Sequence, residues 1–426
     1  MDIVRTGIGI TRTIKNVARA KEILSVLAKN GFDEIIIKTG LHTKIPGLVL
    51  PKKRIALALG DEEYHGDDWW RSIGYRLRKS FEELGPSFIK LGQLLSSRED
   101  IFPAPFIRQM KLLQNKVSPI SFSESKKIIE EALNKKIEDI FSSIDETPIG
   151  VASIGIVYKG QLKDGSDVVI KVRRPNIVPQ IQHDFDIMEF VIAQLEKASE
   201  DFKYMGPSRV LKDFRKTIQL ELNFLIEAMN CEKLSHNLAK IDKDKIFVIP
   251  KVYKDYLTQE VIVLDYLNGK PFNEVKSIDE LSPKLVKNLQ KSVALFMHTL
   301  LSDGFFHADL HGGNFFLLDD DRIGLIDFGL MGNLGKKNRG NLIALMYALT
   351  TNNYENLVYE FLDVADFEQI PNQEVLIRDV RDALMPHIGL SVQDTNINEL
   401  VSAIISTLSK HKIYLPREWF IIFRAM

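Results

Sequence analysis

One short stretch, Gly304–Gly329, constrains this chain more than any other part of its sequence. It reads GFFHADLHGGNFFLLDDDRIGLIDFG and sets three polar side chains in an apolar frame. Asp309 is followed by Asn314, since 314 − 309 = 5, and by Asp327, since 327 − 309 = 18. Phosphoryl transfer needs one group to orient the acceptor oxygen and two to hold Mg²⁺ against a triphosphate. The spacing therefore predicts that Asp309 is catalytic and that Asn314 and Asp327 bind the metal.

A glycine-containing loop and a lysine precede this stretch. Residues 150–157 read GVASIGIV, and the apolar run Val168-Val169-Ile170 ends in Lys171. Glycines let backbone N–H groups approach phosphate oxygens, and protein kinases place a lysine on the following strand to contact the α and β phosphates. An edge-strand lysine facing solvent is the alternative for Lys171. We expect Lys171 to be catalytic together with Asp309. We expect ATP to be bound by Gly150, Val151, Ala152, Ser153, Ile154, Gly155, Val157 and Lys171.

A lysine in such a site requires a carboxylate partner, and a predicted helix over Val210–Asn237 offers two. Glu221 and Glu227 are six residues apart, about 600° of helical rotation, so they do not share one face. At most one of them pairs with Lys171. Two solvated acids on a helix surface remain the alternative.

The histidines of the Gly304–Gly329 stretch are open to two interpretations. His307 is expected to pack and hydrogen-bond locally. A metal-ligand cluster of His307, Asp309 and His311 is disfavoured, because the other histidines of the chain form no second cluster. The role of His311, on the substrate side or structural, stays undecided.

Length, cysteine content and net charge limit the number of domains and the kinds of partner that this chain can have. A chain of 426 residues suits two or three packed units, and a single cysteine, Cys231, leaves no disulfide and fits a reducing environment. A net charge of −1 gives no reason to expect a nucleic-acid partner. No run of 18 or more residues is apolar enough to span a bilayer. We expect no secretory signal, because the N-terminus lacks a basic-then-apolar pattern and a small-residue cleavage site. The sequence ends within an apolar pattern, so a membrane segment beyond residue 426 remains an open expectation.

The first thirty residues are basic. They carry six basic side chains against two acidic ones. A basic amphipathic segment can lie on an anionic membrane, and the alternative is a solvated helix face.

The periodicity of apolar residues predicts an α+β chain, with a sheet-containing small lobe followed by a mostly helical lobe. Helices are expected at Ile14–Lys29, from Asp67 to the Gly85-Pro86 break, and at Pro86–Ser96, Phe122–Leu133, Gln180–Ser199, Val210–Asn237, 282–302 and from about Asn338. Strands are expected at Ile154–Gly160, Asp167–Arg173, Phe247–Val252 and Glu260–Tyr266. The corresponding domains are residues 1–147, 148–268 and 269–426.

Together these residues resemble the AarF/UbiB family of atypical kinases, which is linked to ubiquinone biosynthesis. The most specific element is GPSFIKLGQLLSSREDIFP, Gly85–Pro103, which carries the family's KxGQ signature at Lys90, Gly92 and Gln93. Ordinary protein kinases have nothing comparable. The resemblance runs from about Ile14 to the end, and it implies a protein-kinase-like two-lobed fold with an added N-terminal helical extension that carries the KxGQ motif.

The resemblance also implies roles for individual residues. Glu227 would be the partner of Lys171. The residues of the family's own apparatus, whose helices occlude the place where a peptide would bind, would be Lys90, Gln93 and Glu221. The implied cofactors are ATP and Mg²⁺.

The implied partners are membrane lipids or lipid quinone precursors, and quinone-biosynthesis proteins. The implied location is a membrane surface facing the cytoplasm, with the bacterial inner membrane preferred and the mitochondrial inner membrane as the other option.

The chain departs from the family pattern at several positions. Asn223 stands where the family has an aspartate, Gly150-Val151 precede Ala152 where a run of three alanines is usual, and Ile156 replaces a glutamine. Leu310 and Gly312 replace two prolines of the catalytic loop. None of these changes removes a group required to bind MgATP.

The sequence after Asp327-Phe328-Gly329 bears on the substrate. It runs LMGNLGKKNRGNLIALMYAL directly into a predicted helix, without the APE motif of protein kinases. Because a protein kinase needs that segment as a platform for its peptide, phosphorylation of proteins in trans is not expected.

The leading hypothesis is a Mg²⁺-dependent, ATP-binding atypical kinase or ATPase that supports lipid quinone biosynthesis. The alternatives are a nucleotide-gated lipid-binding or scaffold protein with incidental ATP turnover, and a small-molecule kinase.

Overall fold

The computed structural model describes residues 17–45, 48, 67–96, 98, 101–113, 120–200, 202, 206–367, 371–387, 397–416, 419 and 422. The chain forms two compact units that interrupt one another in sequence. The first comprises Met1–Ile137, Asp145–Tyr158 and Lys171–Leu222, and the second comprises Glu138–Ile144, Lys159–Ile170 and Asn223–Met426. Three basic residues of the N-terminal segment, Arg5, Arg12 and Lys15, lie outside the described residues.

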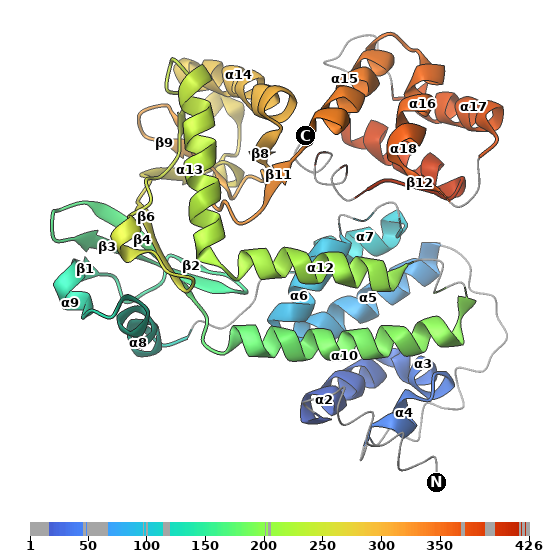
Figure 1. The fold of residues 1–426 in the computed structure, drawn as a ribbon, viewed down its shortest axis with the longest axis horizontal. Coiled ribbons are helices and arrows are strands. Elements are labelled where there is room, and N and C mark those ends of the chain that lie inside the picture. The colour runs from blue at the N-terminus through green and yellow to red at the C-terminus, as the bar shows by residue number, and fades with distance from the viewer. Residues whose placement is uncertain are drawn as a thin grey trace. The chain divides into compact units, whose positions relative to one another are not determined.

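The first unit is mainly helical (Figure 1). Its helices are α2 (Val17–Leu27), the π-helical η1 (Ala28–Phe32), α3 (Asp33–Lys38), α4 (Leu41–Lys44), α5 (Asp67–Leu84), α6 (Pro86–Leu95), α7 (Ala104–Lys111), α8 (Phe122–Leu133), α10 (Ile177–Ala198) and α12 (Pro207–Glu221). The predicted break is confirmed, because Gly85 has φ 93° between α5 and α6 and Pro86 opens α6. The long helices α10 and α12 run side by side in Figure 1.

One apolar cluster holds the first unit together. The helices α2, α5, α6, α7, α10 and α12 all contribute to it, through residues such as Leu24, Phe81, Phe88, Phe106, Phe185 and Phe214. The three- and four-residue spacing that predicted α5 follows from this packing, since Trp70, Ile73 and Leu77 line the same cluster. Helix α6, which carries the KxGQ motif, is therefore part of this core.

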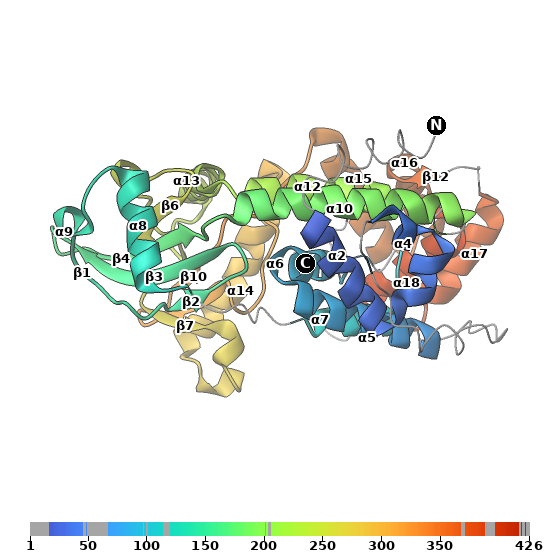
Figure 2. The ribbon, with the colours of Figure 1, turned by 90° about the horizontal axis from the view of Figure 1, so that it is seen from below.

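The second unit combines short strands with helices. Its helices are α13 (Phe224–Ile241), α14 (Pro283–His298), α15 (Lys336–Thr350), α16 (Tyr354–Val364), α17 (Gln373–Leu384) and α18 (Ile397–Lys410), with the short turns η2 (Lys254–Tyr256), η3 (Phe272–Glu274), η4 (Ile278–Glu280) and η5 (Thr299–Asp303). Its strands are β1 (Phe141–Ile144), β5 (Phe247–Val248), β6 (Val261–Asp265), β7 (Gly269–Pro271), β8 (Phe305–His307), β9 (Phe315–Leu318), β10 (Ile323–Leu325), β11 (Met331–Asn333), β12 (Asp366–Phe367) and β13 (Ile413–Tyr414). In Figures 1 and 2 the four C-terminal helices, coloured orange to red, form one group.

The boundary between the units passes through the strands β3 (Gly155–Leu162) and β4 (Asp167–Arg173), and the short helix α9 (Ile137–Ile140) also crosses it. A five-stranded sheet has the order β1-β3-β4-β6, with β2 (Gly150–Val151) paired to β3. A four-stranded sheet has the order β5-β10-β9-β7, in which β10 pairs parallel to β5 and antiparallel to β9. The smaller sheets are β11-β8 and β12-β13.

The predicted single helix over Val210–Asn237 is wrong. The chain leaves α12 at Glu221 and begins α13 at Phe224. Between them Asn223 is extended, at φ −119° and ψ 99°, and its side-chain Oδ1 accepts a hydrogen bond of 3.1 Å from the Leu225 N–H. Because this cap satisfies a free N–H of the new helix, it stabilises the break. Glu221 and Glu227 therefore stand on different helices.

Two smaller predictions also need correction. Helix α8 has the predicted bounds. The sequence pattern suggested that Ser123 and Glu124 open it, but Ser121 is the cap, in a reciprocal pair with Glu124. The strand expected over Phe247–Val252 is confined to Phe247–Val248, and it belongs to the β5-β10-β9-β7 sheet. The sequence Lys163-Asp164-Gly165-Ser166 predicts a turn that joins two strands in a hairpin, and β3 and β4 do pair there, with Gly165 at φ 89° in the turn.

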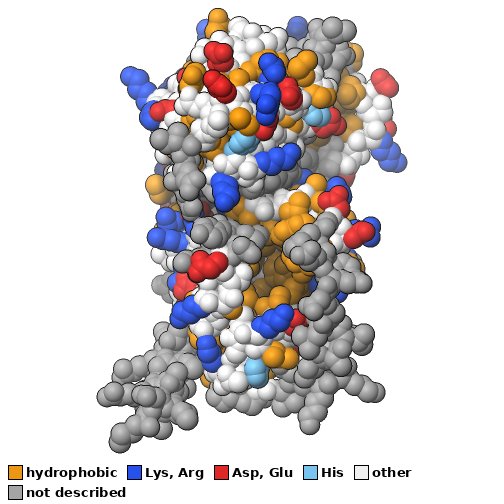
Figure 3. Space-filling model, turned by 90° about the vertical axis from the view of Figure 1, so that its right-hand side faces the viewer, with side chains coloured by type: hydrophobic (Ala, Val, Ile, Leu, Met, Phe, Trp, Pro, Cys, Tyr) orange, Lys and Arg blue, Asp and Glu red, His pale blue; other side chains and the backbone are white. Residues whose placement is uncertain are grey.

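The surface mixes both charges. On the face drawn in Figure 3, Lys and Arg side chains are interspersed with Asp and Glu side chains. Among the residues that the structure describes, no helix is both long enough and apolar enough to cross a membrane.

Candidate functional site

The loop after β8 is organised by a buried histidine. His307 Nε2 lies 3.1 Å from the carbonyl oxygen of Ile326, and Nδ1 accepts a hydrogen bond of 3.2 Å from the Asp309 N–H. Burial lowers the pKa of His307, which favours the neutral ring that can donate at one nitrogen and accept at the other. His307 thus links the Asp309 loop to the residue before Asp327, as the structural interpretation expects.

Asn314 is fixed in the same loop. Its Nδ2 donates to the Asp309 carbonyl at 3.0 Å, and its backbone carbonyl accepts from the Ile326 N–H at 3.1 Å. The side chain is buried. Since the amide nitrogen is used in this bond, the amide oxygen is the atom that remains to ligate a cation.

Asp327 has an unusual backbone conformation. Its φ of 59° lies in the left-handed region, which a residue with a Cβ enters at a cost of about 1–3 kcal/mol. Its Oδ1 accepts a 3.3 Å hydrogen bond from the Gly329 N–H, which helps to hold this turn. Residues in such conformations concentrate at functional sites, where the surrounding structure enforces them.

The next residue, Phe328, anchors the turn in the core. Its ring is completely buried, meets His307 edge-on at 5.6 Å between ring centroids, and belongs to the apolar cluster around α13. Asn230 of α13 donates to the Phe328 carbonyl at 2.9 Å. Glu227, one turn earlier on α13, is buried. In the second unit the structure therefore connects α13, the Asp309 loop and the Asp327 turn through Phe328.

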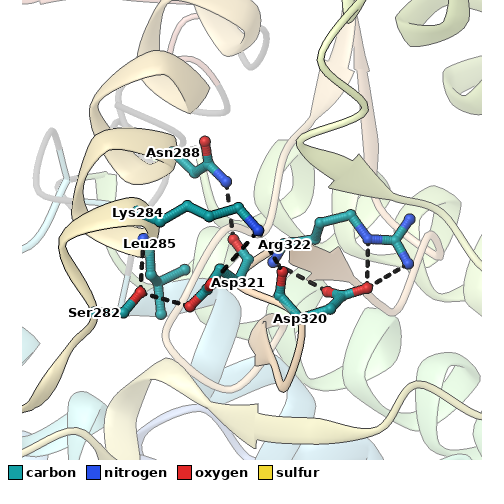
Figure 4. Close-up of polar contacts among 7 residues, drawn as sticks. All are labelled: Ser282, Lys284, Leu285, Asn288, Asp320, Asp321 and Arg322. Carbon is teal, nitrogen blue, oxygen red and sulfur yellow. Dashed lines mark hydrogen bonds and ion pairs between the residues drawn. The ribbon is translucent and has the colours of Figure 1, made fainter.

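The hairpin between Asn314 and Asp327 is fastened at its far end (Figure 4). Ser282, the cap of α14, donates to Asp321 Oδ1 at 2.5 Å, and Lys284 Nζ lies 3.5 Å from Asp321 Oδ2. Asn288 donates to the Asp321 carbonyl at 2.9 Å. Because β9 follows Asn314 and β10 precedes Asp327, these contacts attach to α14 the hairpin that carries both predicted metal ligands.

The glycine-containing loop lies in the first unit and forms a tight hairpin. Gly150 pairs with Val157 and Val151 with Ile156, while the Ala152 N–H donates to the Gly155 carbonyl at 2.9 Å. The turn residues Ser153 and Ile154 are buried. Lys171 lies on β4 in the same unit.

The KxGQ motif lies on α6. Lys90 Nζ is 2.8 Å from Glu221 Oε2, an ion pair in which both side chains are partly buried. A Cβ at Gly92 would lie 2.1 Å from Leu113 Cδ1 and 2.9 Å from Phe81 Cδ2, so a larger residue requires these two side chains to move. Gln93 is on the same helix, and its carbonyl accepts from the Ser96 hydroxyl at 2.6 Å.

The structure thus brings the predicted site residues together in two groups. The first unit holds the loop of Gly150–Val157 with Lys171, and the pair of Lys90 with Glu221. The second unit holds Glu227, Asp309, Asn314 and Asp327. Their convergence on one nucleotide remains a prediction.

Two residues with clear contacts were missed from the sequence. Asn230 holds the Phe328 carbonyl, and Arg174 donates from Nε to the Ala152 carbonyl at 3.0 Å. Asn230 stands three residues after Glu227, near it on the helix, which was an available signal. Nothing in the sequence distinguishes Arg174 from Arg173.

Other arrangements of chemical groups are less supported. No group of three or more His, Cys, Asp or Glu side chains suited to a metal occurs among the described residues, so the cluster of His307, Asp309 and His311 gains no support. Burial, followed by the charge of Glu227, raises the pKa of Cys231 to about 12, so its thiol stays protonated and unreactive. A cavity of about 670 Å³ beside α13, lined by residues of Cys231–Ala239 and Ile249–Tyr256, contains none of the predicted site residues.

The strands, the helices and the hairpin between Asn314 and Asp327 define a kinase-like fold of mixed helix and sheet. Residues 112–361, more than half of the 426, match the ABC1 atypical kinase-like domain, and the chain belongs to this family. The expected kinase-like α+β fold and the AarF/UbiB resemblance are both confirmed.

Curated relatives carry a consistent name. The chain is 32% identical over 348 residues to a "Probable protein kinase UbiB" of Erwinia tasmaniensis, which covers 80% of this chain and 61% of the relative. A protein of the same name from Pseudomonas fluorescens is 33% identical over 296 residues, covering 68% of this chain and 55% of the relative. The chain thus spans about three fifths of the length of the curated relatives that it matches.

Among solved structures, the complex of Rv3197 with erythromycin from Mycobacterium tuberculosis is similar at 21% identity. The match covers 77% of this chain and 89% of that one, with a TM-score of 0.46.

Proposed function

We propose that the protein is an atypical kinase or ATPase that binds ATP with Mg²⁺ and supports ubiquinone biosynthesis. The observation that carries the proposal is the set of bonds joining Asp309, Asn314 and the Asp327 turn through His307 and Phe328. These bonds hold the Asp309 backbone and the Asn314 side chain beside the Asp327 turn, which supports the placing of a candidate base close to two candidate metal ligands, as phosphoryl transfer requires.

The donor set suits Mg²⁺. A carboxylate at Asp327 and an amide oxygen at Asn314 are the hard oxygen ligands that this ion takes, with water and phosphate oxygens as its other ligands. Bound there, Mg²⁺ would neutralise charge on the β and γ phosphates. Asp309, whose N–H is held by His307, would accept the proton of the attacking hydroxyl or water. Lys171 would contact the α and β phosphates, with Glu227 as its partner.

The acceptor is proposed to be something other than a protein. Helix α15 begins at Lys336, seven positions after Gly329, since 336 − 329 = 7. This short connection leaves no room for the segment on which protein kinases bind their peptide. The Lys90–Glu221 pair supports a packed KxGQ helix, the element that occludes a peptide in the family.

The UbiB name of the relatives supports the link to ubiquinone, and with it a proposed membrane-associated setting. Flotation with vesicles of anionic lipid tests that setting.

Thermal unfolding with and without MgATP tests nucleotide binding. At a ligand concentration of one hundred times Kd the stabilisation is about 2.7 kcal/mol, which for a chain of this size shifts Tm by roughly 2–4 °C. Asp327→Asn should lose the Mg²⁺-dependent part of the shift, and Asp303→Asn, a change at an exposed aspartate, should retain it. A wild type without any Mg²⁺-nucleotide shift would count against the proposal.

The scaffold alternative is separated by complementation in a cell that lacks the gene. If turnover is required, Asp309→Asn and Lys171→Ala both fail to restore quinone levels. If Asp309→Asn restores them while Lys171→Ala does not, nucleotide binding is sufficient. Product analysis with labelled ATP and candidate metabolites identifies a small-molecule kinase.

A further inference from the structure

A buried guanidinium lies beneath the glycine-containing loop. Arg174 directly follows β4, three residues after Lys171, and only 9% of its surface is exposed. Burial lowers the pKa of Arg174, which reflects the cost of removing its charge from water. Because a buried charge is costly unless it is paired or hydrogen-bonded, the contacts of Arg174 should show why this position carries one.

Those contacts fasten the turn of the loop from both sides. Arg174 Nε donates to the Ala152 carbonyl at 3.0 Å, and the Arg174 backbone N–H donates to the Ile154 carbonyl at 2.8 Å. The two acceptors flank Ser153, which is itself buried. A rigid planar donor is well suited to fix such a turn, and a lysine offers no equivalent fork.

The tip of the loop is also anchored by packing. Ile154 is 7% exposed and belongs to the apolar cluster of the first unit, together with residues of α5, α6 and α10 such as Phe81, Phe88 and Ile181. A loop that closes over a ligand like a flap would have an exposed tip and few bonds to the body beneath it. This loop has the opposite character, since its two turn side chains are buried.

We propose that Arg174 is a positioning residue of the nucleotide site, which with Ile154 pins the Ala152–Gly155 turn to the helical body. The preformed turn then presents its N–H groups to the phosphates without a loop-ordering step, and nucleotide affinity depends on the helical body that also carries the KxGQ motif. This inference rests on the proposed ATP-binding function. Arg174 acts through the loop backbone and touches no reacting atom.

Hydrogen exchange of the free protein tests the pin without nucleotide. Arg174→Met keeps a long apolar side chain but removes the bond to Ala152, and amides of residues 150–157 should exchange roughly tenfold faster or more. Arg173→Met is the control at the neighbouring arginine, because Arg173 Nη1 donates to the Leu222 carbonyl at 2.7 Å. Its loop exchange should equal that of the wild type. Arg174→Lys should be intermediate.

Nucleotide binding is the second readout. Arg174→Met should weaken the Kd for MgATP about tenfold, equivalent to about 1.4 kcal/mol. In turnover it should raise KM for ATP far more than it lowers kcat, a split that a general loss of stability does not produce. Ile154→Ala should act in the same direction, and Ile149→Ala, at an exposed position before the same hairpin, should not. If Arg174→Met does not fold, the comparison of Ile154→Ala with its control Ile149→Ala tests the proposal instead.

The outcomes separate the two proposals. A wild type that binds no MgATP refutes the proposed function, while the exchange experiment still reports on the pin. A wild type that binds MgATP, with Arg174→Met and Ile154→Ala matching their controls in exchange and affinity, overturns the inference about Arg174.

Discussion

The bond between Arg19 and Asp184 offers the sharpest test of how the helical unit is held together. Asp184, on α10, has no exposed surface, and the Arg19 side chain on α2 is 14% exposed. Arg19 donates to both oxygens of Asp184, at 2.7 and 3.2 Å, and also to the Leu84 carbonyl at the end of α5. Burial acts to lower the pKa of Arg19, but the hydrogen bond and the charge of Asp184 act against it and keep this pKa above its ordinary value. One guanidinium thus ties three helices.

Removing one partner leaves a buried charge without its counter-ion, which costs about 3–5 kcal/mol. Asp184→Ala should destabilise the protein by about 3 kcal/mol, the lower end of this range, because Arg19 keeps its contacts with Glu22 at 3.0 Å and with the Leu84 carbonyl. Arg19→Met should destabilise the protein by about 5 kcal/mol, because it leaves the buried Asp184 carboxylate without its counter-ion. The double variant Arg19→Met/Asp184→Leu should be more stable than either single variant, because it buries no charge.

Urea unfolding, combined with hydrogen exchange of peptides from α2 and α10, measures these differences. The control is the exposed pair of Lys29 and Glu83 at 3.0 Å, with 69% and 38% of the side chains exposed. Glu83→Ala should change stability by no more than about 1 kcal/mol. The reasoning is refuted if Asp184→Ala is no more destabilising than Glu83→Ala.

Three further predictions concern other parts of the chain. Gly92→Ala places a Cβ 2.1 Å from a Leu113 carbon and should destabilise by about 1–3 kcal/mol, measured by urea unfolding. Asn223→Asp, which restores the family's aspartate, should leave Tm nearly unchanged because Asp caps a helix as well as Asn does, and a fall of several degrees would contradict the capping role. The hydrogen bond from His411 holds the pKa of Asp379 below its ordinary value. This stabilisation is present above the ordinary carboxyl pKa and is lost as the pH falls through the lowered pKa of Asp379. When Tm is measured against pH, it should therefore fall less on acidification in Asp379→Asn than in the wild type.

Local signals in the sequence predicted most of the secondary structure correctly. The Gly85-Pro86 break, the bounds of α8 and the β3–β4 hairpin depend on residues close together in the chain, and each has a specific backbone preference. The merged helix over Val210–Asn237 failed because periodicity continued across a break that a single capping residue, Asn223, creates. The overlong strand at Phe247 failed because pairing with β10, distant in sequence, sets its length.

The candidate site divides in the same way. Asp309 and Asn314 were found from their spacing because the hydrogen bonds that orient them are made within a few residues. Asn230 and Arg174 were missed because the carbonyls that they hold are 98 and 22 residues away. Both bonds are made to backbone atoms, which carry no sequence signal of their own.

The burial of Phe328 has a consequence for inhibitor design. Its ring is fully enclosed and meets the His307 ring edge-on, and its carbonyl is held by Asn230. Compounds that inhibit by displacing this phenylalanine and occupying its vacated pocket would first have to empty a packed core and break that bond, at a cost comparable to a Phe→Ala substitution, about 3–5 kcal/mol. Chemical screens against this protein should therefore favour scaffolds that leave the aromatic ring in place.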